Sequence, residues 1–107
     1  MSRASGRWRP VTTLDDLWSG EMRGLEVDGA PIIVVNLAGD IYPYDDRCPH
    51  SGQPLSRGSL DGVVLTCAAH EWSFDCRSGA GVNPATAALH RLEVRVDDEV
   101  VSVRSTS

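Results

Sequence analysis

Two short pairs of cysteine and histidine constrain this chain more than any other feature of its sequence. The first pair is Cys48 and His50, the second is Cys67 and His70, and sixteen residues lie between the pairs. Residues this close in sequence can reach a common centre only if the backbone turns tightly between them. Two such loops that face each other bring two thiolates and two imidazoles together, so the sequence predicts a four-ligand metal site.

The ligand types leave two kinds of metal site open. A [2Fe–2S] cluster can take both cysteines on one iron and both histidines on the other. A single zinc ion can bind the same four side chains tetrahedrally and merely hold the two loops together. Zinc modules more often space their ligands as C-x₂₋₄-C and H-x₃₋₅-H, so the observed spacing favours the iron–sulfur cluster.

Signals for short strands recur along the chain, whereas helix signals are almost absent. Apolar and polar residues alternate over residues 91–96, which is typical of a half-buried strand. Asp28-Gly29 predicts a hairpin turn, and residues 13–18 predict an N-cap followed by one helical turn. The expected strands cover residues 8–11, 21–27, 32–37, 41–44, 63–66, 71–74, 91–96 and 100–103. Many short strands with frequent turns favour an all-β fold, an antiparallel sandwich or barrel.

The length of 107 residues is enough for one domain with a modest core. Residues 45–62 are rich in Pro, Gly and Ser and are expected to form a loop that contains the first ligand pair. Both ligand pairs lie in mid-sequence at the ends of expected strands. We therefore expect a single domain over residues 1–107, in which a metal-binding subdomain of about residues 46–84 is inserted into a β base formed by residues 7–45 and 85–104.

The charge balance disfavours one class of partner. Fifteen acidic residues against ten basic ones give a formal net charge of −5, which argues against a nucleic-acid-binding surface. A mildly acidic small protein is suited to a basic docking face, although the same charge could serve only to keep the chain in solution. Asp45 and Asp46, just before the first ligand pair, are interpreted as a turn with solvated charges.

Neither a membrane span nor a secretory signal is recognisable in the sequence. We therefore expect no membrane partner, a cytoplasmic location and a monomer. If Cys48 and Cys67 bind metal, Cys76 has no cysteine left to pair with, which fits a reducing compartment. Cys76 is interpreted as an incidental thiol in a turn, and His90 as a structural or surface histidine rather than a ligand.

With these features the chain resembles the Rieske ferredoxins. The pattern C-x-H, sixteen residues, C-x-x-H is the cluster-binding signature of that family, and the loops Cys48-Pro49-His50-Ser51-Gly52 and Cys67-Ala68-Ala69-His70-Glu71-Trp72-Ser73-Phe74 match it. The resemblance spans nearly the whole chain. Residues 18–22 and 79–84 are similar to the ferredoxin components of bacterial multicomponent diiron monooxygenases of the toluene and alkene type.

The resemblance implies a Rieske fold and one [2Fe–2S] cluster bound by Cys48, His50, Cys67 and His70. It implies a one-electron carrier rather than an enzyme. An NADH-dependent reductase with flavin and iron–sulfur groups would supply the electrons. The diiron hydroxylase of an aromatic or alkene monooxygenase would receive them, with a Rieske-type ring-hydroxylating dioxygenase as the alternative recipient.

Residues next to the ligands give further expectations. High-potential Rieske proteins carry an additional cysteine in each loop, and a serine and a tyrosine whose hydroxyls donate to cluster sulfurs. Here Trp72 and Phe74 stand at the positions of those hydroxyls, so we expect a potential at the low end of the Rieske range, around −150 mV. Trp72 could pack beneath the loops or lie at their surface rim, with the rim slightly favoured. Pro49, Gln53 and Pro84 are expected to set the shape of the loops.

Overall fold

The computed structural model describes residues 8–49, 54–68, 72–83 and 87–104. Within these ranges the regular elements are short strands and one 3₁₀ helix, η2. The elements are β1 (Arg9–Thr13), β2 (Met22–Val27), β3 (Ala30–Leu37), β4 (Asp40–Asp45), η2 (Leu55–Arg57), β5 (Ser59–Asp61), β6 (Val64–Thr66), β7 (Ser73–Asp75), β8 (Gly81–Asn83), β9 (Glu93–Asp97) and β10 (Val100–Arg104). In the described part of the chain, no helix has the length and apolar character needed to cross a membrane.

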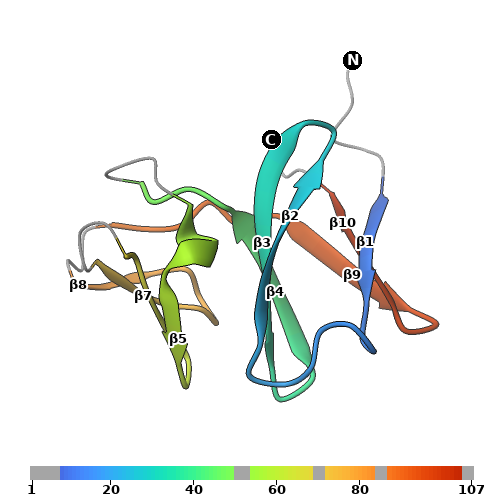
Figure 1. Cartoon of the computed structure of the whole chain (residues 1–107), viewed down its shortest axis with the longest axis horizontal. Helices are drawn as coiled ribbons and strands as arrows, with labels where there is room; N and C mark the ends of the chain where they lie inside the picture. The colour runs from blue at the N-terminus through green and yellow to red at the C-terminus, as the bar shows by residue number, and fades with distance from the viewer. Residues whose placement is uncertain (1–7, 50–53, 69–71, 84–86, 105–107) are drawn as a thin grey trace.

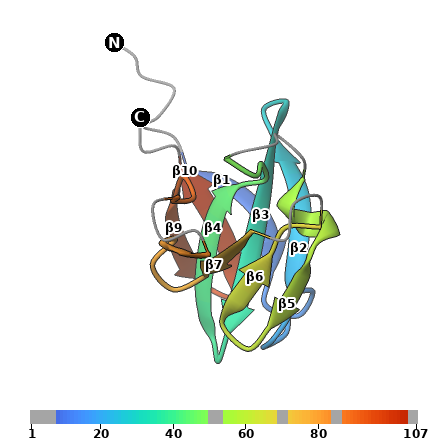
Figure 2. The ribbon, with the colours of Figure 1, turned by 90° about the vertical axis from the view of Figure 1, so that its left-hand side faces the viewer.

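The strands form three antiparallel sheets. Their strand orders are β1-β10-β9, β2-β3-β4 and β5-β6-β7-β8. The four-stranded sheet lies on the left of Figure 1 and the two three-stranded sheets on the right. Figure 2, which views the molecule from that left-hand side, shows β5, β6 and β7 in front of the other strands. The prediction of an all-β antiparallel fold is confirmed.

Strand β3 lies at the centre because both of its faces are buried. Ile32 and Val34 belong to one hydrophobic cluster, which they share with residues of β10. Ile33 and Val35 belong to a second cluster, which includes residues of β6 and β7. A strand covered on both sides has a continuous apolar run rather than an alternating one, and residues 32–35 are such a run. This strand therefore joins the core of the base to the sheet that carries the second ligand pair.

Tight two-residue turns connect several of the strand pairs. Asp28 and Gly29 both have positive φ, +53° and +84°, so the predicted hairpin between β2 and β3 is present. Asp98 and Glu99 connect β9 to β10 with φ of +54° and +66°. Two successive left-handed residues match the right-handed twist of the flanking strands, and here the second pair does so without a glycine.

The predicted helical turn at residues 13–18 is a hydrogen-bonded turn without an α-helix. Asp16 N–H donates to the Thr13 carbonyl at 3.1 Å, and Leu17 N–H donates to the Leu14 carbonyl at 3.4 Å. These bonds span three residues, as in a 3₁₀ turn. The Leu17 side chain is buried in the core of the base, and Gly20, the predicted stop, has a positive φ of +85° that a helix does not allow.

Three elements were not predicted: η2, β5 and β8. Strand β5 pairs with β6 over only three residues, and β8 has a register shift against β7. Strands this short carry no periodic pattern of their own, and they exist because a partner strand lies beside them. The alternation over residues 91–96 is weaker than expected, because Leu92 is buried whereas Val96 is 43% exposed. Strand β9 is the edge of its sheet, so its later residues extend beyond the core.

Candidate metal centre

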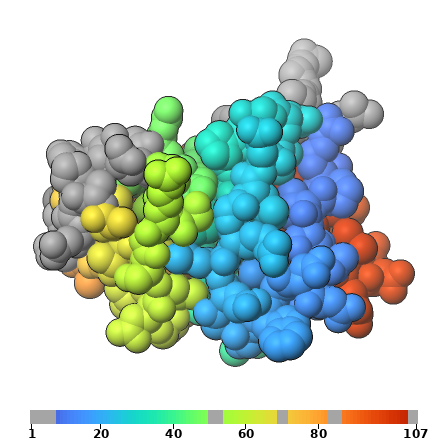
Figure 3. Space-filling model, viewed as in Figure 1, coloured from blue at the N-terminus to red at the C-terminus, as the bar shows by residue number. Residues whose placement is uncertain are grey.

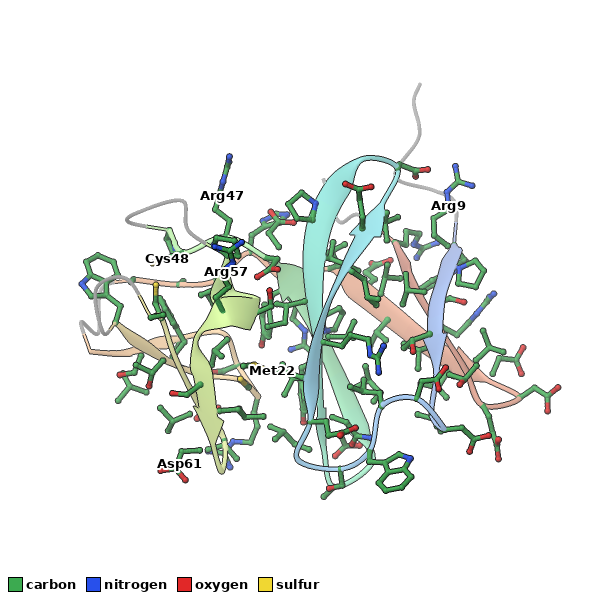
Figure 4. All side chains as sticks on the ribbon, viewed as in Figure 1. Arg9, Met22, Arg47, Cys48, Arg57 and Asp61 are labelled. Carbon is green, nitrogen blue, oxygen red and sulfur yellow. The ribbon has the colours of Figure 1, made fainter. Side chains whose placement is uncertain are left out.

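The two predicted cysteine ligands lie at the ends of strands. Cys48 follows β4 by three residues, and Cys67 directly follows β6. Both side chains are fully buried, and Figure 4 shows Cys48 on the side of the molecule that holds the four-stranded sheet. Pro49 is exposed. Four of the predicted site residues lie outside the described part of the chain: His50, Gln53, His70 and Pro84.

The surroundings of the two thiols suit a buried sulfur-bound group. Cys48 and Cys67 belong to one hydrophobic cluster that also contains Leu55, Leu65 and Phe74. Both thiols are therefore shielded from water, and they lie in the same apolar environment. Each cysteine also begins the loop in which its histidine follows, two residues later in the first and three later in the second. Two buried sulfur donors, each followed in the sequence by a histidine, fit a [2Fe–2S] group bound by both sulfur and nitrogen.

A buried carboxylate fixes the start of the first loop. Asp46 is 7% exposed, and its Oδ1 accepts the Ser56 N–H at 2.8 Å. Its Oδ2 accepts the Ser56 hydroxyl at 2.6 Å, and its own N–H donates to the Pro31 carbonyl at 3.1 Å. The interpretation of Asp46 as a solvated charge in a turn is wrong. We call the two bonds between Asp46 and Ser56 the clasp, because they connect the segment before Cys48 to η2.

Two glycines allow the backbone to approach closely around the clasp. A Cβ on Gly24 of β2 would lie 2.7 Å from Ser56 Oγ and 3.1 Å from Asp46 Oδ2. A Cβ on Gly58 would overlap the carbonyl oxygen of Thr66, the residue before Cys67. Figure 3 shows the segment of η2 and β5 packed directly against β2. Glycine inside an expected strand is a known sign of close backbone approach, and Gly24 is the position where that sign was missed.

The second loop connects β6 to β7. Leu65 pairs with Phe74 across these strands, and the Cys67 N–H donates to the Trp72 carbonyl at 2.6 Å. This bond closes the connection that contains His70. The Phe74 side chain is fully buried in the same cluster as Cys67, and the half-buried Trp72 packs against that cluster.

A buried tyrosine supports the far side of the four-stranded sheet. The Tyr44 hydroxyl donates to the Cys76 carbonyl at 2.7 Å, and the Tyr44 side chain is fully buried. Gly79 has φ of +81°, and a Cβ there would lie 2.9 Å from Tyr44 Cε1. Burial raises the pKa of Tyr44 to about 12. This contact joins β4 of the base to the chain just after β7.

Cys76 lies in a turn, as predicted, and its side chain belongs to the buried core. Its side chain has no exposed area. Burial, with a smaller contribution from the Asp75 carboxylate, raises the pKa of the Cys76 thiol to about 11. The thiolate is the reactive form of cysteine, so this residue is inert at neutral pH. All three cysteines are free of disulfides.

Comparison with known proteins gives a family match over most of the chain. A model of the Rieske [2Fe-2S] domain matches residues 7–98, a range that contains both ligand pairs. The ferredoxin component of the alkene monooxygenase system of Xanthobacter autotrophicus is 39% identical over 89 residues, which cover 81% of this chain and 72% of that protein.

Two further matches come from dioxygenase systems. The ferredoxin component of the naphthalene 1,2-dioxygenase and salicylate 5-hydroxylase systems of a Ralstonia species is 30% identical over 98 residues, covering 91% of this chain and 94% of that protein. A chain in the solved complex of reduced oxygenase and oxidized ferredoxin in carbazole 1,9a-dioxygenase superposes with a TM-score of 0.83 at 32% identity, covering 91% of this chain and 92% of that one.

Proposed function

Because this chain belongs to the Rieske [2Fe–2S] family, we propose that it passes electrons one at a time to the diiron hydroxylase of an alkene or aromatic monooxygenase. The chain carries one Rieske-type [2Fe–2S] cluster, which excludes the structural zinc module. It is a ferredoxin of the kind found in oxygenase systems, an electron-transfer component and not the catalyst.

The relative from an alkene monooxygenase supports the diiron recipient. Its identity of 39% exceeds the 30% of the relative from the naphthalene dioxygenase system. A ring-hydroxylating dioxygenase is the second candidate recipient, supported by the dioxygenase relatives and by the carbazole system. The proposed electron donor is an NADH-dependent reductase with flavin and iron–sulfur groups. A cytoplasmic monomer suits an exchange in which one small protein visits two partners in turn.

The proposed ligands are the four residues of the two sequence pairs. Cys48 and Cys67 would bind one iron through sulfur, and His50 and His70 would bind the other through nitrogen. The burial of both thiols in one cluster supports this assignment. We assign residues 46–84 as the cluster-binding subdomain within a base of residues 7–45 and 85–104, since the four-stranded sheet arises between β4 and β9.

The third cysteine and the third histidine provide matched controls for the ligand assignment. Cys67→Ser and His70→Asn should abolish the visible absorption and the acid-labile sulfide of the purified protein. Cys76→Ala and His90→Gln should retain the visible absorption and the sulfide, because the Cys76 side chain packs in the hydrophobic core and His90 is exposed. Loss of the cluster in the His90 variant, or its retention in the His70 variant, would contradict the assignment.

Reconstituted turnover tests the choice of recipient. The purified ferredoxin is combined with an NADH-dependent reductase and, in parallel, with an alkene monooxygenase diiron hydroxylase and with the terminal oxygenase of a naphthalene dioxygenase. We expect ferredoxin-dependent alkene oxidation in the first mixture and little naphthalene oxidation in the second. The Cys67→Ser protein serves as the blank. Turnover only in the second mixture would favour the dioxygenase instead.

A further inference from the structure

The short segment of residues 55–58, which comprises η2 and the glycine that follows it, contacts both metal loops. Ser56 forms the clasp with Asp46, at the start of the first loop. Gly58 lies against the carbonyl oxygen of Thr66, at the start of the second loop. We call residues 55–58 the brace, because positions only two residues apart in this segment contact the backbone that leads into each loop.

The contact of the brace with the first loop consists of hydrogen bonds. The Asp46 carboxylate accepts bonds of 2.8 and 2.6 Å from Ser56 alone, and Asp46 is only 7% exposed. A buried carboxylate is costly unless its oxygens accept hydrogen bonds, so the clasp is held closed. Gly24 of β2 lies behind it, where a Cβ would be 2.7 Å from Ser56 Oγ. The position of Cys48, two residues after Asp46, is therefore tied to the brace.

The contact of the brace with the second loop is steric. A Cβ on Gly58 would overlap the carbonyl oxygen of Thr66 and would lie 3.2 Å from the carbonyl oxygen of Leu55. Gly58 has φ of −81°, outside the left-handed region, so the glycine is needed for space and not for an unusual φ. The next residue, Ser59, pairs with Thr66 across β5 and β6. The brace therefore leads directly into the strand pair that ends at Cys67.

The brace also packs into the environment of the two thiols. Leu55 is fully buried, and it belongs to the same hydrophobic cluster as Cys48 and Cys67. Closely packed interiors transmit displacements between neighbouring groups. A shift of the brace should therefore move one cysteine relative to the other.

We propose that the brace sets the relative position of Cys48 and Cys67. Asp46, Ser56 and Gly58 are then positioning residues for the [2Fe–2S] cluster. This inference rests on the proposed function, in which the two cysteines are the sulfur ligands. The groups that orient the ligands of a metal site tune the properties of the metal. Changes in the brace should therefore alter the electronic properties of the cluster and not only the stability of the fold.

Two glycines of the same sheet provide a matched pair of variants. Gly58→Ala places a methyl group against the Thr66 carbonyl. Gly62→Ala makes the same change in the turn between β5 and β6, where a Cβ would meet nothing within 4 Å and only the backbone, with φ of +62°, is strained. Both changes should lower Tm.

Electron paramagnetic resonance of the reduced protein and protein-film voltammetry compare the two variants. In Gly58→Ala both the g values and the reduction potential should shift from those of the wild type, whereas Gly62→Ala should retain the wild-type values. A Gly58→Ala protein with wild-type g values and potential would overturn the brace.

Two variants of Asp46 test the other end without adding any atom to the brace. Asp46→Ala removes both bonds of the clasp. Asp46→Asn keeps a carbonyl oxygen for the Ser56 N–H and an amide group for the Ser56 hydroxyl. Both variants lose the same charge, so a difference between them reports the hydrogen bonds. The g values should shift in Asp46→Ala and return to those of the wild type in Asp46→Asn. Cluster loss under a chelator should be about tenfold faster in Asp46→Ala than in Asp46→Asn. Equal g values in both variants would contradict the proposal.

A double-mutant cycle tests whether the brace connects the two loops. Residues coupled through one element have effects that do not simply combine, whereas distant sites act independently. The rate of cluster loss in Asp46→Ala/Gly58→Ala should differ at least about threefold from the product of the two single effects. Asp46→Ala/Gly62→Ala should match its product to within about twofold. Independent effects in both pairs would show that the loops are held separately.

Failure of the brace and failure of the proposed function are distinguishable. If the wild-type protein supports turnover of an oxygenase but Gly58→Ala and Asp46→Ala have wild-type g values, the brace is wrong and the proposed function stands. If the wild-type protein supports no oxygenase but these variants shift the g values, the proposed function fails and the brace stands.

Discussion

At the scale of single residues, the metal loops depend on side chains outside the ligand motif. Asp46 and Ser56 hold the first loop against η2, and Gly58 lets the backbone pass close to Thr66. These contacts position the segments that carry Cys48 and Cys67. These contacts therefore help to keep the two thiols together in one buried hydrophobic cluster.

The clasp should help the protein to retain its [2Fe–2S] cluster. Asp46→Ala removes both bonds to Ser56, including the bond of a buried carboxylate, and should lower the free energy of unfolding by about 2–3 kcal/mol. Ser56→Ala removes only the hydroxyl bond and should cost about 1 kcal/mol. Guanidinium unfolding gives both values, and the loss of visible absorption under a chelator should be faster in the first variant. An Asp46→Ala protein as stable as Ser56→Ala would show that the backbone bond contributes nothing.

The side chain at position 74 should tune the reduction potential. Phe74 is fully buried in the same hydrophobic cluster as Cys67. As a phenylalanine it has no hydroxyl to donate to the sulfurs of the [2Fe–2S] cluster. Phe74→Tyr should raise the potential by about 50 mV or more, because a hydrogen bond to a charged group contributes about 1.5–3 kcal/mol and about 1.4 kcal/mol corresponds to about 59 mV for one electron. Protein-film voltammetry measures the change. An unchanged potential together with a lower Tm would mean that the hydroxyl is buried without a partner.

At the scale of secondary-structure elements, β3 and the turns decide the arrangement. Strand β3 has two buried faces. Its hairpin turn to β2 has a glycine, Gly29, at a position with the left-handed conformation that glycine adopts readily. The turn between β9 and β10 places Glu99 at φ of +66° without a glycine. A left-handed conformation costs a residue with a Cβ roughly 1–2 kcal/mol, so this turn is a weak point of the base.

Replacing that turn should stabilise the protein. Asp98→Asn/Glu99→Gly introduces the pair that such hairpins favour and should raise Tm by a few degrees. The gain should persist in about 0.5 M salt, where relief of repulsion between acidic side chains is screened. Gly29→Glu is the matched reverse change, since a Cβ there would meet nothing within 4 Å and only the backbone is strained. It should lower Tm, and calorimetry measures both shifts. A gain that disappears in salt would assign the effect to charge.

At the scale of the whole molecule, the two parts of the structure are joined by buried groups that titrate only at high pH. Tyr44 and Cys76 connect β4 to the four-stranded sheet through the bond from the Tyr44 hydroxyl to the Cys76 carbonyl. Burial raises the pKa of Tyr44 from 10.0 to about 12. Burial likewise raises the pKa of the Cys76 thiol from 9.0 to about 11. In both groups the folded state retains a proton that the unfolded chain releases.

The sign of the pH dependence follows from these raised pKa values. Below about pH 8 both groups are protonated in the folded and the unfolded state, so their contribution to stability is fully present. As pH rises from about 8 to 12, the unfolded chain loses protons first and the free energy of unfolding should fall, by about 4 kcal/mol at pH 11. Guanidinium unfolding at pH 8 and 11 measures this loss. Tyr44→Phe/Cys76→Ala should show a smaller loss, and an equal loss in the variant would assign it to other groups.

The charge distribution also belongs to this scale. The net charge of −5 is a sum over the sequence, whereas the clasp decides that the segments of Arg47 and Arg57 are neighbours in space. A docking surface depends on the local field, and only the folded backbone determines which charges are neighbours.

The sequence by itself determined the fold class and the kind of metal site. Residues 32–35 and the alternating residues 91–96 predicted strands, and Asp28-Gly29 predicted a hairpin, because periodicity and turn chemistry are local properties. The spacing of the two cysteine–histidine pairs favoured a [2Fe–2S] cluster over zinc, and the resemblance implied the Rieske type. Family membership confirms that cofactor. The assignment of the individual ligands stays a prediction.

Only the tertiary structure decided which distant residues support the site. Asp46 looks like any acidic loop residue until Ser56, ten positions later, is found beside it. Strands β5 and β8 are too short to have a periodic pattern, and their partners determine them. The physical reason is the same in both cases. Hydrogen bonds and burial between segments far apart in the chain leave no local signal, because each segment is ordinary until the other packs against it.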